Sequence, residues 1–319
     1  MGFEDRSIFK DVYGILLFEK QTKNLTMVSI IIINYNTFTL TSDCIHSVIA
    51  QSKEVAFEII LVDNASTQCN ADEFLKEFPM VKLIKSEVNG GFASGNNLGI
   101  KKATGDYILL LNSDTILAED SIGKCIDFLH QQKDIGVLGC RMTFPDGRVQ
   151  YTARKFRGIS WELLDLFRFI PLLMPYTQKA KLMLGKYFRH DEVMEADWIN
   201  GAFFLFPRHV VEELPNKKLD DRFFMNGEDQ LWCEQIKNLG YRNIFYAGTT
   251  IIHINSGSTD ISKQLNLRKI MMKHELEIVA NRKGKGLYYY VFKIIYVSKE
   301  ATRNFIKSVA FKLTGRLIR

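Results

Sequence analysis

Apolar runs alternate with amphipathic stretches along the first third of the chain, and this alternation predicts the fold. Four short runs are rich in β-branched and aliphatic residues, as is typical of buried strands: VSIIII (28–33), FEIILV (57–62), VKLIK (81–85) and YILLL (107–111). Helical patterns lie between them, at 40–49, 70–78 and 94–103. The sequence therefore predicts an α/β fold with a Rossmann-like, mostly parallel sheet flanked by helices.

The pattern is less regular after Pro145. Residues 161–176 mix aromatic side chains with charged ones, which predicts an amphipathic segment rather than a membrane span. We interpret 150–192 as an insertion beside the site, and a packed helical hairpin without a special role is the alternative. Regular patterns return as an apolar run at 202–206, a helix at 229–239 and strands near 243–246 and 250–253.

Composition excludes several classes of protein. With 46% hydrophobic residues, a chain of 319 residues can bury a large core, so intrinsic disorder is not expected. The five cysteines are scattered and lack the CxxC spacing of thiolate metal sites, which favours a reduced, cytoplasmic compartment. Residues 1–26 contain acidic as well as basic residues and do not resemble a signal peptide.

Charge is distributed unevenly along the chain. Residues 282–319 hold ten Lys or Arg and one acid, Glu300, so the net charge of this segment is +9. The whole chain has a net charge of +6, so residues 1–281 sum to −3. Residues 287–297 are too short to span a bilayer, but they are rich in the aromatic residues that favour its interface. We expect the tail to bind an anionic membrane surface; a basic helix packed on its own domain and a nucleic-acid-binding segment are the alternatives.

Polar residues follow three of the predicted strands. Asn34 follows the first strand, Asp63 and Asn64 the second, and Asn112 and Asp114 the fourth. Ligands of doubly wound sheets bind at the carboxyl ends of strands, so we expect one shared crevice. Asp63 suits a nucleobase or ribose, although a helix cap is its alternative role. Asp114 offers an oxygen ligand for Mg²⁺ or Mn²⁺, and a surface turn is the alternative for this segment.

Two further segments contribute candidate residues. The stretch NGGFASGNNLG (89–99) includes Gly91, which permits close backbone approach, and Asn96, which offers an amide near a helix start. It lacks the Rossmann glycine spacing and the Walker lysine, so a dinucleotide or ATP site is not expected. Glu228 and Asp229 open a predicted helix, where a carboxylate serves as a general base or merely interacts with the helix dipole. His253 ends a strand and is a candidate second metal ligand or a structural histidine.

The ordered motifs resemble the GT-A fold, family 2 glycosyltransferases, and most closely their rhamnosyltransferase-like branch acting on bacterial surface polysaccharides. The motifs are VSIIIINYN, EIILVDNAST, NGGFASGNNLGI, GDYILLLNSDT, PDG, DWINGAFFLFPR, FFMNGEDQLWCEQIKNLGY and IIHINSGS, in this order. The resemblance implies three parts: an N-terminal extension (1–26), a glycosyltransferase domain (27–255) with 150–192 on the acceptor side, and a C-terminal helical basic segment (256–319).

The same resemblance implies a role for each candidate residue. The enzyme would be an inverting, metal-dependent hexosyltransferase, and its metal motif has asparagine at position 112 where the family's Asp-x-Asp pattern has an aspartate. Asp229 would be the catalytic base. The other implied roles are nucleotide binding for Asn34, Asp63, Asn64, Gly91, Asn96 and Asn112, metal binding for Asp114 and His253, and donor or acceptor sugar contact for Trp198, Gly201 and Glu228.

The substrate is less constrained than the reaction. We expect dTDP-L-rhamnose as donor on the resemblance alone, with a UDP-hexose such as UDP-galactose as the alternative, because uracil and thymine present the same imide edge. The expected acceptor is a saccharide, in particular a lipid-linked one, and the expected location is the cytoplasmic face of the inner membrane. A non-catalytic, membrane-associated nucleotide-binding module is the alternative outside the enzymes.

Overall fold

The computed structural model describes residues 26–255 and 261–314. One ten-stranded mixed sheet forms the centre, with strand order β3-β2-β1-β4-β11-β6-β12-β5 and with β7 and β9 paired to β6 and β12. Its strands are β1 (Met27–Asn34), β2 (Ala56–Asp63), β3 (Lys82–Lys85), β4 (Tyr107–Asn112), β5 (Thr115–Leu117), β6 (Ile135–Thr143), β7 (Val149–Gln150), β9 (Met194–Ala196), β11 (Phe203–Pro207) and β12 (Arg242–His253). A separate pair consists of β8 (Ala153–Arg154) and β10 (Trp198–Ile199).

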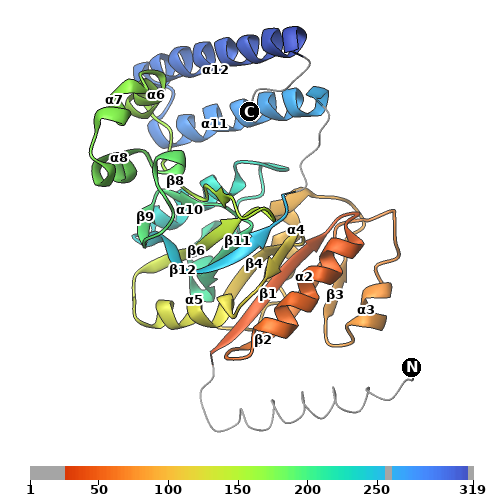
Figure 1. Ribbon diagram of the computed structural model, residues 1–319. Helices are drawn as coiled ribbons and strands as arrows, with labels where there is room; N and C mark the ends of the chain where they lie inside the picture. Colours follow the sequence, from red (N-terminus) through yellow and green to blue (C-terminus); the bar gives the residue numbers. More distant parts are fainter. Residues whose placement is uncertain (1–25, 256–260, 315–319) are drawn as a thin grey trace.

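Helices cover both faces of the sheet and form a separate layer at one end (Figure 1). The helices are α2 (Phe38–Gln51), α3 (Glu73–Glu77), α4 (Gly91–Ile100), α5 (Ser121–His130), α6 (Ile159–Leu166), α7 (Phe169–Leu173), α8 (Tyr176–Met183), α9 (Arg208–Glu213), α10 (Glu228–Asn238), α11 (Ile261–Lys283) and α12 (Leu287–Thr314), with short 3₁₀ turns at Gly185–Tyr187 and Pro215–Lys217. The predicted α/β class, the helices on the sheet and the helical C-terminal segment are confirmed.

Side-chain alternation along β1 explains why the sheet has a core on each face. Ile30 and Ile32 belong to the core cluster that contains Cys44 of α2, whereas Ile31 belongs to the cluster that contains Ala93 of α4. All three isoleucines are fully buried. A strand covered on both faces must be apolar at every position, which is why the run at 28–33 is continuous rather than alternating.

The structure corrects several predicted boundaries. The helix after β1 begins at Phe38, two residues before the predicted pattern at 40–49, and the Thr41 hydroxyl within it donates to Asn34 Oδ1 (2.9 Å). The two strands predicted at 243–246 and 250–253 are one strand, β12, with an irregularity in its pairing between Tyr246 and Thr250. β6 was not predicted, and β11 runs antiparallel to its neighbours β4 and β6.

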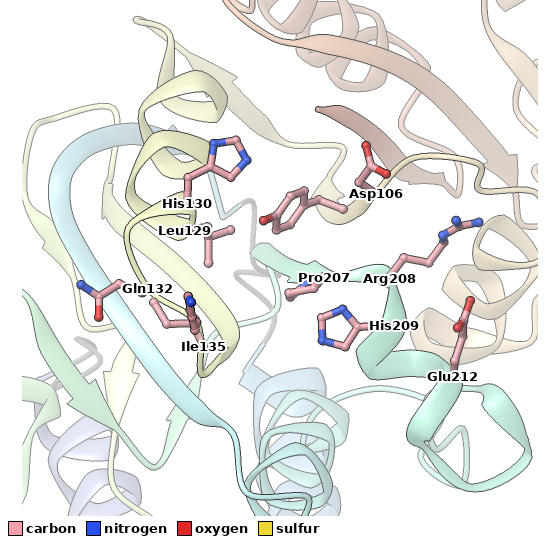
Figure 2. Close-up of a pocket in the computed structure, with 11 residues that line it drawn as sticks. Asp106, Leu129, His130, Gln132, Ile135, Pro207, Arg208, His209 and Glu212 are labelled. Carbon is pink, nitrogen blue, oxygen red and sulfur yellow. The ribbon is translucent and has the colours of Figure 1, made fainter. Parts of the chain in front are cut away.

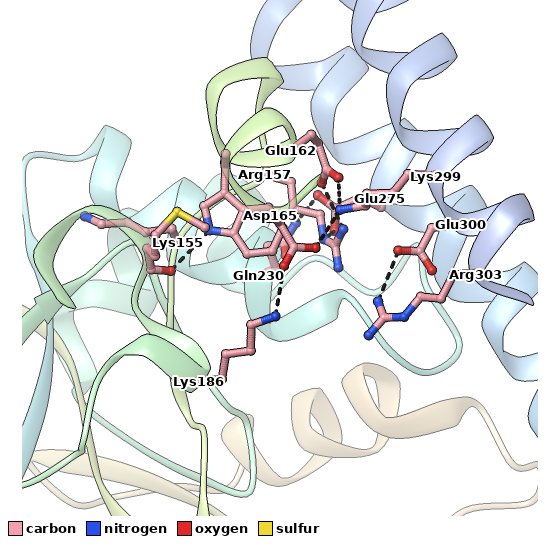
Figure 3. A network of polar contacts seen from close by, with 12 residues as sticks. Lys155, Arg157, Glu162, Asp165, Lys186, Gln230, Glu275, Lys299, Glu300 and Arg303 are labelled. Atoms are coloured by element: carbon pink, nitrogen blue, oxygen red, sulfur yellow. Dashed lines mark hydrogen bonds and ion pairs between the residues drawn. The ribbon is translucent and has the colours of Figure 1, made fainter. Parts of the chain in front are cut away.

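Buried ion pairs attach the C-terminal helices to the 150–192 region (Figure 3). Lys299 of α12 contacts both Glu162 and Asp165 of α6, and the two carboxylates are 0% and 5% exposed. Lys186 reaches the other oxygen of Asp165 at 2.9 Å. Because each buried carboxylate has a cationic partner, α6 and α12 are held in a fixed relation. None of the described helices combines the length and apolar composition needed to span a bilayer.

Candidate active site

The carboxyl ends of β1 and β2 bring Asn34 and Asp63 together. The two strands pair in parallel register with Asn34 opposite Asp63, and Asn34 Nδ2 donates to Asp63 Oδ1 at 2.7 Å. The Asn64 backbone N–H donates to the Asn34 carbonyl (2.8 Å), and the Ser66 N–H donates to Asp63 Oδ2 (3.1 Å). Asp63 therefore organises the turn after β2 as well as lying at the predicted nucleotide end of the sheet.

Gly91 joins this corner to the loop that precedes α10. Its φ of +85° is in the left-handed region, and a Cβ there would lie 2.2 Å from the Phe224 carbonyl oxygen. The next residue, Phe92, donates its N–H to the same carbonyl at 3.0 Å. Asn64 Nδ2 donates to the Gly91 carbonyl at 3.1 Å. Only glycine allows this close approach, so the glycine in the NGGF segment positions backbone against backbone.

The two asparagines of α4 serve its packing in this structure. Asn96 Nδ2 donates to the Phe92 carbonyl of its own helix (3.0 Å), and Asn96 Oδ1 is buried without a hydrogen-bond partner among the described residues. Asn97 exchanges two hydrogen bonds with the backbone of Leu219, which ties α4 to the segment before α10. The predicted nucleotide contact of Asn96 stays a prediction.

Asp114 and His253 converge at the ends of β4 and β12. β12 pairs with β5 so that His253 lies opposite Thr115, and Asp114 Oδ1 is 3.3 Å from His253 Nε2. Asn112 Nδ2 is 3.4 Å from the same nitrogen. The side chains of Asp114 and His253 are 17% and 9% exposed, so both lie at the edge of solvent rather than deep in the core.

Gln150 fixes the orientation of the histidine ring, a role that sequence patterns did not predict. Gln150 Nε2 donates to the His253 carbonyl (2.6 Å), so its Oε1 is the atom that faces His253 Nδ1 at 2.8 Å. Nδ1 therefore donates its proton to Gln150, and Nε2, which is directed at Asp114, is the nitrogen that can bind a metal in the neutral ring. A histidine ligand held by a second hydrogen bond is the usual arrangement at metal sites.

These donors fit a divalent cation that also binds phosphate oxygens. Asp114 supplies a carboxylate and His253 an imidazole nitrogen, a combination suited to Mn²⁺ and, through the oxygen, to Mg²⁺. Within residues 26–255 and 261–314, no three or more His, Cys, Asp or Glu side chains form a complete metal cluster. Two protein ligands leave several coordination positions, which a diphosphate and water can fill.

The two acidic residues at the start of α10, the buried Glu228 and the half-buried Asp229, form an interacting pair. Asp229 accepts hydrogen bonds from the backbone N–H groups of Gly201 (3.2 Å) and Gln230 (2.8 Å). Burial raises the pKa of Asp229, and these two hydrogen bonds and the charge of Arg154 only partly offset the increase. Burial and the neighbouring charge of Asp229 raise the pKa of Glu228. A carboxyl pair with raised pKa values is typical of a site that performs proton transfer.

Trp198 and Gly201 lie on the same side as this pair. β10 places Trp198 against β8, where Arg154 stacks on the indole ring at 5.4 Å and the indole N–H donates to the Lys155 carbonyl (3.2 Å). A Cβ at Gly201 would lie 3.5 Å from Asp229 Cβ and 3.3 Å from the ring of Phe92. Arg154 was not predicted as a site residue. Its positive charge acts to lower the pKa of Asp229.

Helix α11 supports the loop that leads into Glu228 and Asp229. His274 Nδ1 donates to the Asn226 carbonyl at 2.6 Å, and its ring stacks on Phe223 with centroids 4.1 Å apart. Glu275 Oε1 accepts a hydrogen bond from Gln230 Nε2 (3.2 Å). The C-terminal segment thus contacts the residues on both sides of the acidic pair, which sequence patterns did not predict.

A continuous set of contacts connects the predicted residues. It runs from Asp63 through Asn34 and Asn64 to Gly91, and from there through the loop at Phe224 into α10. Gly201 contacts Asp229, and the next residue, Ala202, accepts the Asn112 N–H at 3.0 Å. Asn112 leads to His253 and Asp114. The residues at the strand ends are therefore linked by one set of contacts, and their shared role as an active site stays a prediction.

A separate pocket lies at the opposite end of the sheet (Figure 2). Its volume is about 670 Å³, and its lining includes Asp106, His130, His209 and Glu212. It is bordered by Tyr107 at the start of β4, whereas the candidate site lies beyond the end of that strand. The pocket therefore contains none of the predicted site residues.

Sequence comparison relates the chain to sugar-transferring enzymes. Residues 29–191 match the sequence model of glycosyl transferase family 2. Over 189 residues the chain is 34% identical to an uncharacterized glycosyltransferase of Haemophilus influenzae, covering 57% of this chain and 72% of that protein. Over 235 residues it is 27% identical to the O-antigen biosynthesis protein RfbC of Myxococcus xanthus, covering 72% of this chain but only 17% of that protein.

Solved structures show the same fold at low sequence identity. The mannosyltransferase PcManGT of Pyrobaculum calidifontis, in complex with GDP-Man and Mn²⁺, matches with a TM-score of 0.58 and 14% identity, covering 96% of this chain and 83% of that chain. GalNAc-T7 with UDP, GalNAc and Mn²⁺ matches with a TM-score of 0.56 and 18% identity, covering 92% and 59%. The predicted GT-A type of α/β fold is confirmed.

Proposed function

We propose that this chain, which belongs to glycosyl transferase family 2, transfers a sugar from a nucleotide diphosphate to a saccharide acceptor with inversion at the anomeric carbon. The observation that carries the proposal is the contact path from Asp63 to Asp229 and Asp114. Three groups lie along this path at one end of the sheet. They are the hydrogen-bonded Asn34 and Asp63, the carboxylate and imidazole of Asp114 and His253, and the acidic pair Glu228 and Asp229. These are the three components that the transfer requires.

Asp229 acts as the general base in the proposed reaction. The acceptor hydroxyl loses its proton to the Asp229 carboxylate while its oxygen attacks the anomeric carbon from the side opposite the diphosphate. Hydrogen bonds from the Gly201 and Gln230 N–H groups hold that carboxylate in one orientation. The raised pKa places its basicity closer to the operating pH than that of an ordinary aspartate, which favours proton transfer.

Asp114 and His253 would hold a divalent cation, which when bound neutralises charge on the diphosphate leaving group. Gln150 holds the His253 ring so that Nε2 is directed to the same point as Asp114 Oδ1. Because position 112 is asparagine rather than aspartate, the protein contributes a single carboxylate here. We therefore propose that the cation binds tightly only together with the nucleotide.

The donor we propose is dTDP-L-rhamnose, and its support is the resemblance of the ordered motifs. The curated relative RfbC is an O-antigen biosynthesis protein, which supports a role in cell-surface polysaccharide synthesis. Another relative, a poly(ribitol-phosphate) beta-glucosyltransferase of Bacillus spizizenii, is 32% identical over 117 residues, 35% of this chain and 18% of that protein. A lipid-linked saccharide acceptor on the cytoplasmic face of the membrane is consistent with the basic tail.

Calorimetric titration tests the proposal directly. The purified chain is titrated with dTDP, UDP, GDP and ADP, each with Mn²⁺ and with EDTA. We expect metal-dependent binding with dTDP preferred, followed by transfer from dTDP-L-rhamnose. A preference for UDP would retain the reaction and exclude rhamnose as donor. If no nucleotide binds in either condition, the catalytic proposal fails.

A further inference from the structure

Helix α12 has two apolar faces, and only one of them is covered. Phe292 and Tyr296 are buried and belong to a small core cluster with Val279 of α11. On the opposite face Leu287 is 82% exposed and Ile294 is 67% exposed. Val291, Phe305 and Val309 continue the same exposed stripe at spacings of three, four or eleven residues, as one side of a helix requires. A helix that packs only as part of a core has no need of this second stripe.

A second set of exposed apolar side chains lies at the end of α6 and on α7. Leu172 and Leu173 are 69% and 84% exposed, and Phe169 is 61% exposed. Leu166 and Phe167, which precede them, are also exposed. Single exposed apolar residues are common on protein surfaces, but a contiguous group marks an interaction surface.

The two sets adjoin each other. α6 packs against α12, and a groove of about 660 Å³ between them is lined by Leu163 and Leu166 on one side and by Ile294 and Ile306 on the other. The ion pairs of Lys299 with Glu162 and Asp165 hold the two helices together, and Lys299 and Asp165 also line this groove. Figure 1 shows α6 and α7 beside α12, in the helical layer at the top of the view. Because α7 follows α6 directly in the chain, we group the exposed residues of 163–173 and 287–309 as one surface, which we name the α7–α12 face.

Charge and aromatic content identify the partner of this face. Three lysines near the start of α12 are exposed: Lys283 at the end of α11, Lys285 in the turn and Lys293 on α12. The 282–319 segment as a whole carries +9. Tyr288 and Tyr290 are partly exposed, and tyrosine places its ring in an apolar phase with its hydroxyl in water. Lysines beside leucines and tyrosines are typical of helices that lie in the interface of an anionic bilayer.

A second copy of the chain is a poorer partner for the same surface. A two-fold interface places each patch against itself, so the positive charge of one tail would face the positive charge of the other. We propose that the α7–α12 face is a single membrane-binding surface for anionic lipid, in which α7 of the 150–192 region inserts alongside α12. The basic tail alone is therefore not the membrane-binding unit, and the proposal does not depend on the sugar donor.

Vesicle sedimentation of the full chain tests the proposal. The vesicles contain phosphatidylethanolamine with phosphatidylglycerol, or phosphatidylcholine alone. We expect binding to the anionic vesicles only. Leu172→Ser combined with Leu173→Ser removes two exposed apolar side chains that lie outside the core clusters. The affinity for anionic vesicles should fall roughly tenfold or more. The matched control, Leu75→Ser combined with Met80→Ser, changes two exposed apolar residues outside the face and should bind as the wild type does.

Three results would overturn the proposal. Unchanged vesicle binding by the α7 double variant would remove α7 from the surface. Equal binding to neutral vesicles would remove the charge argument. Dimerisation in light scattering that the same variant abolishes would assign the face to a second copy. Calorimetry with dTDP and Mn²⁺ on each variant separates these failures from failure of the proposed enzyme, because nucleotide binding does not use this face.

Discussion

Replacing Asp229 by asparagine separates catalysis from folding at this site. The substitution keeps the shape of the side chain but removes its ability to accept a proton. General-base catalysis contributes typically 10²- to 10⁴-fold, so kcat should fall by about that factor, which corresponds to roughly 3–5 kcal/mol of transition-state stabilisation. Nucleotide affinity should stay within about twofold, because the nucleotide corner at Asp63 belongs to other strands.

The structural cost of the same change is much smaller. An asparagine oxygen accepts one of the two N–H groups that now bond to the carboxylate, so one hydrogen bond is lost, a cost of about 0.5–1.5 kcal/mol. A second effect favours the variant. Each pKa unit by which burial raises the pKa of this pair lowers the stability of the native protein with an ionised carboxylate by about 1.4 kcal/mol, and asparagine, which does not ionise, avoids this cost. At neutral pH the free energy of unfolding of the variant should therefore be equal to or higher than that of the wild type.

The pH dependence follows from the direction of the shift. Because the folded pKa values are raised, the native state holds more protons than the unfolded state between about pH 4, the ordinary carboxyl value, and the raised values. This pair therefore contributes a decrease in stability as pH rises through this window, and combining Asp229→Asn with Glu228→Gln should remove that contribution. Activity should show the opposite trend, since kcat/KM rises as Asp229 loses its proton.

Single-turnover kinetics with radiolabelled donor and urea unfolding at several pH values measure both quantities. The exposed Asp127→Asn change on α5 is the matched control and should alter neither. Near-normal kcat in Asp229→Asn would refute the base assignment. A parallel loss of activity and stability would instead show that the residue is structural.

Three further predictions concern the metal pair and the glycine corner. Asp114→Ala should remove the difference between Mn²⁺ and EDTA in nucleotide titrations, and a retained difference would place the cation elsewhere. Gln150→Leu should weaken Mn²⁺ binding in the presence of nucleotide by about 10- to 100-fold through the loss of His253 orientation, whereas Gln150→Glu should restore most of it. Gly91→Ala should destabilise the fold by about 1–3 kcal/mol in urea unfolding, because its Cβ would meet the Phe224 carbonyl in a strained backbone region; an unchanged midpoint would contradict this.

Continuous apolar runs made the parallel half of the sheet predictable. Each residue of β1 between Val28 and Ile32 is buried on one face or the other, so the pattern and the packing agree. β6 escaped prediction because Gly136 and Gly139 interrupt it, and glycine usually weakens a strand. In the structure a Cβ at these positions would lie 2.3 Å from Ile236 and 2.1 Å from Ile199. The glycines make room for neighbouring side chains, which only the three-dimensional packing reveals.

Some residues of the candidate site could also be predicted from sequence patterns, and others could not. Residues at strand ends, such as Asn34 and Asp63, could be predicted because local patterns locate the end of each strand. Gln150 could not, because its partner His253 is 103 residues away in sequence, and the contact of His274 with Asn226 spans 48 residues. Supporting residues act through such long-range pairs, and a single sequence carries no record of them.

The dipeptide Gly201-Ala202 fixes how the proposed base and the metal pair are placed relative to each other. Gly201 donates its N–H to Asp229, and the Ala202 carbonyl accepts the Asn112 N–H. Both contacts are made by the backbone directly before β11, a central strand held between β4 and β6. In-line displacement requires the base and the leaving group at fixed positions on opposite sides of the sugar, and small misplacements are costly. A rigid strand supplies that geometry.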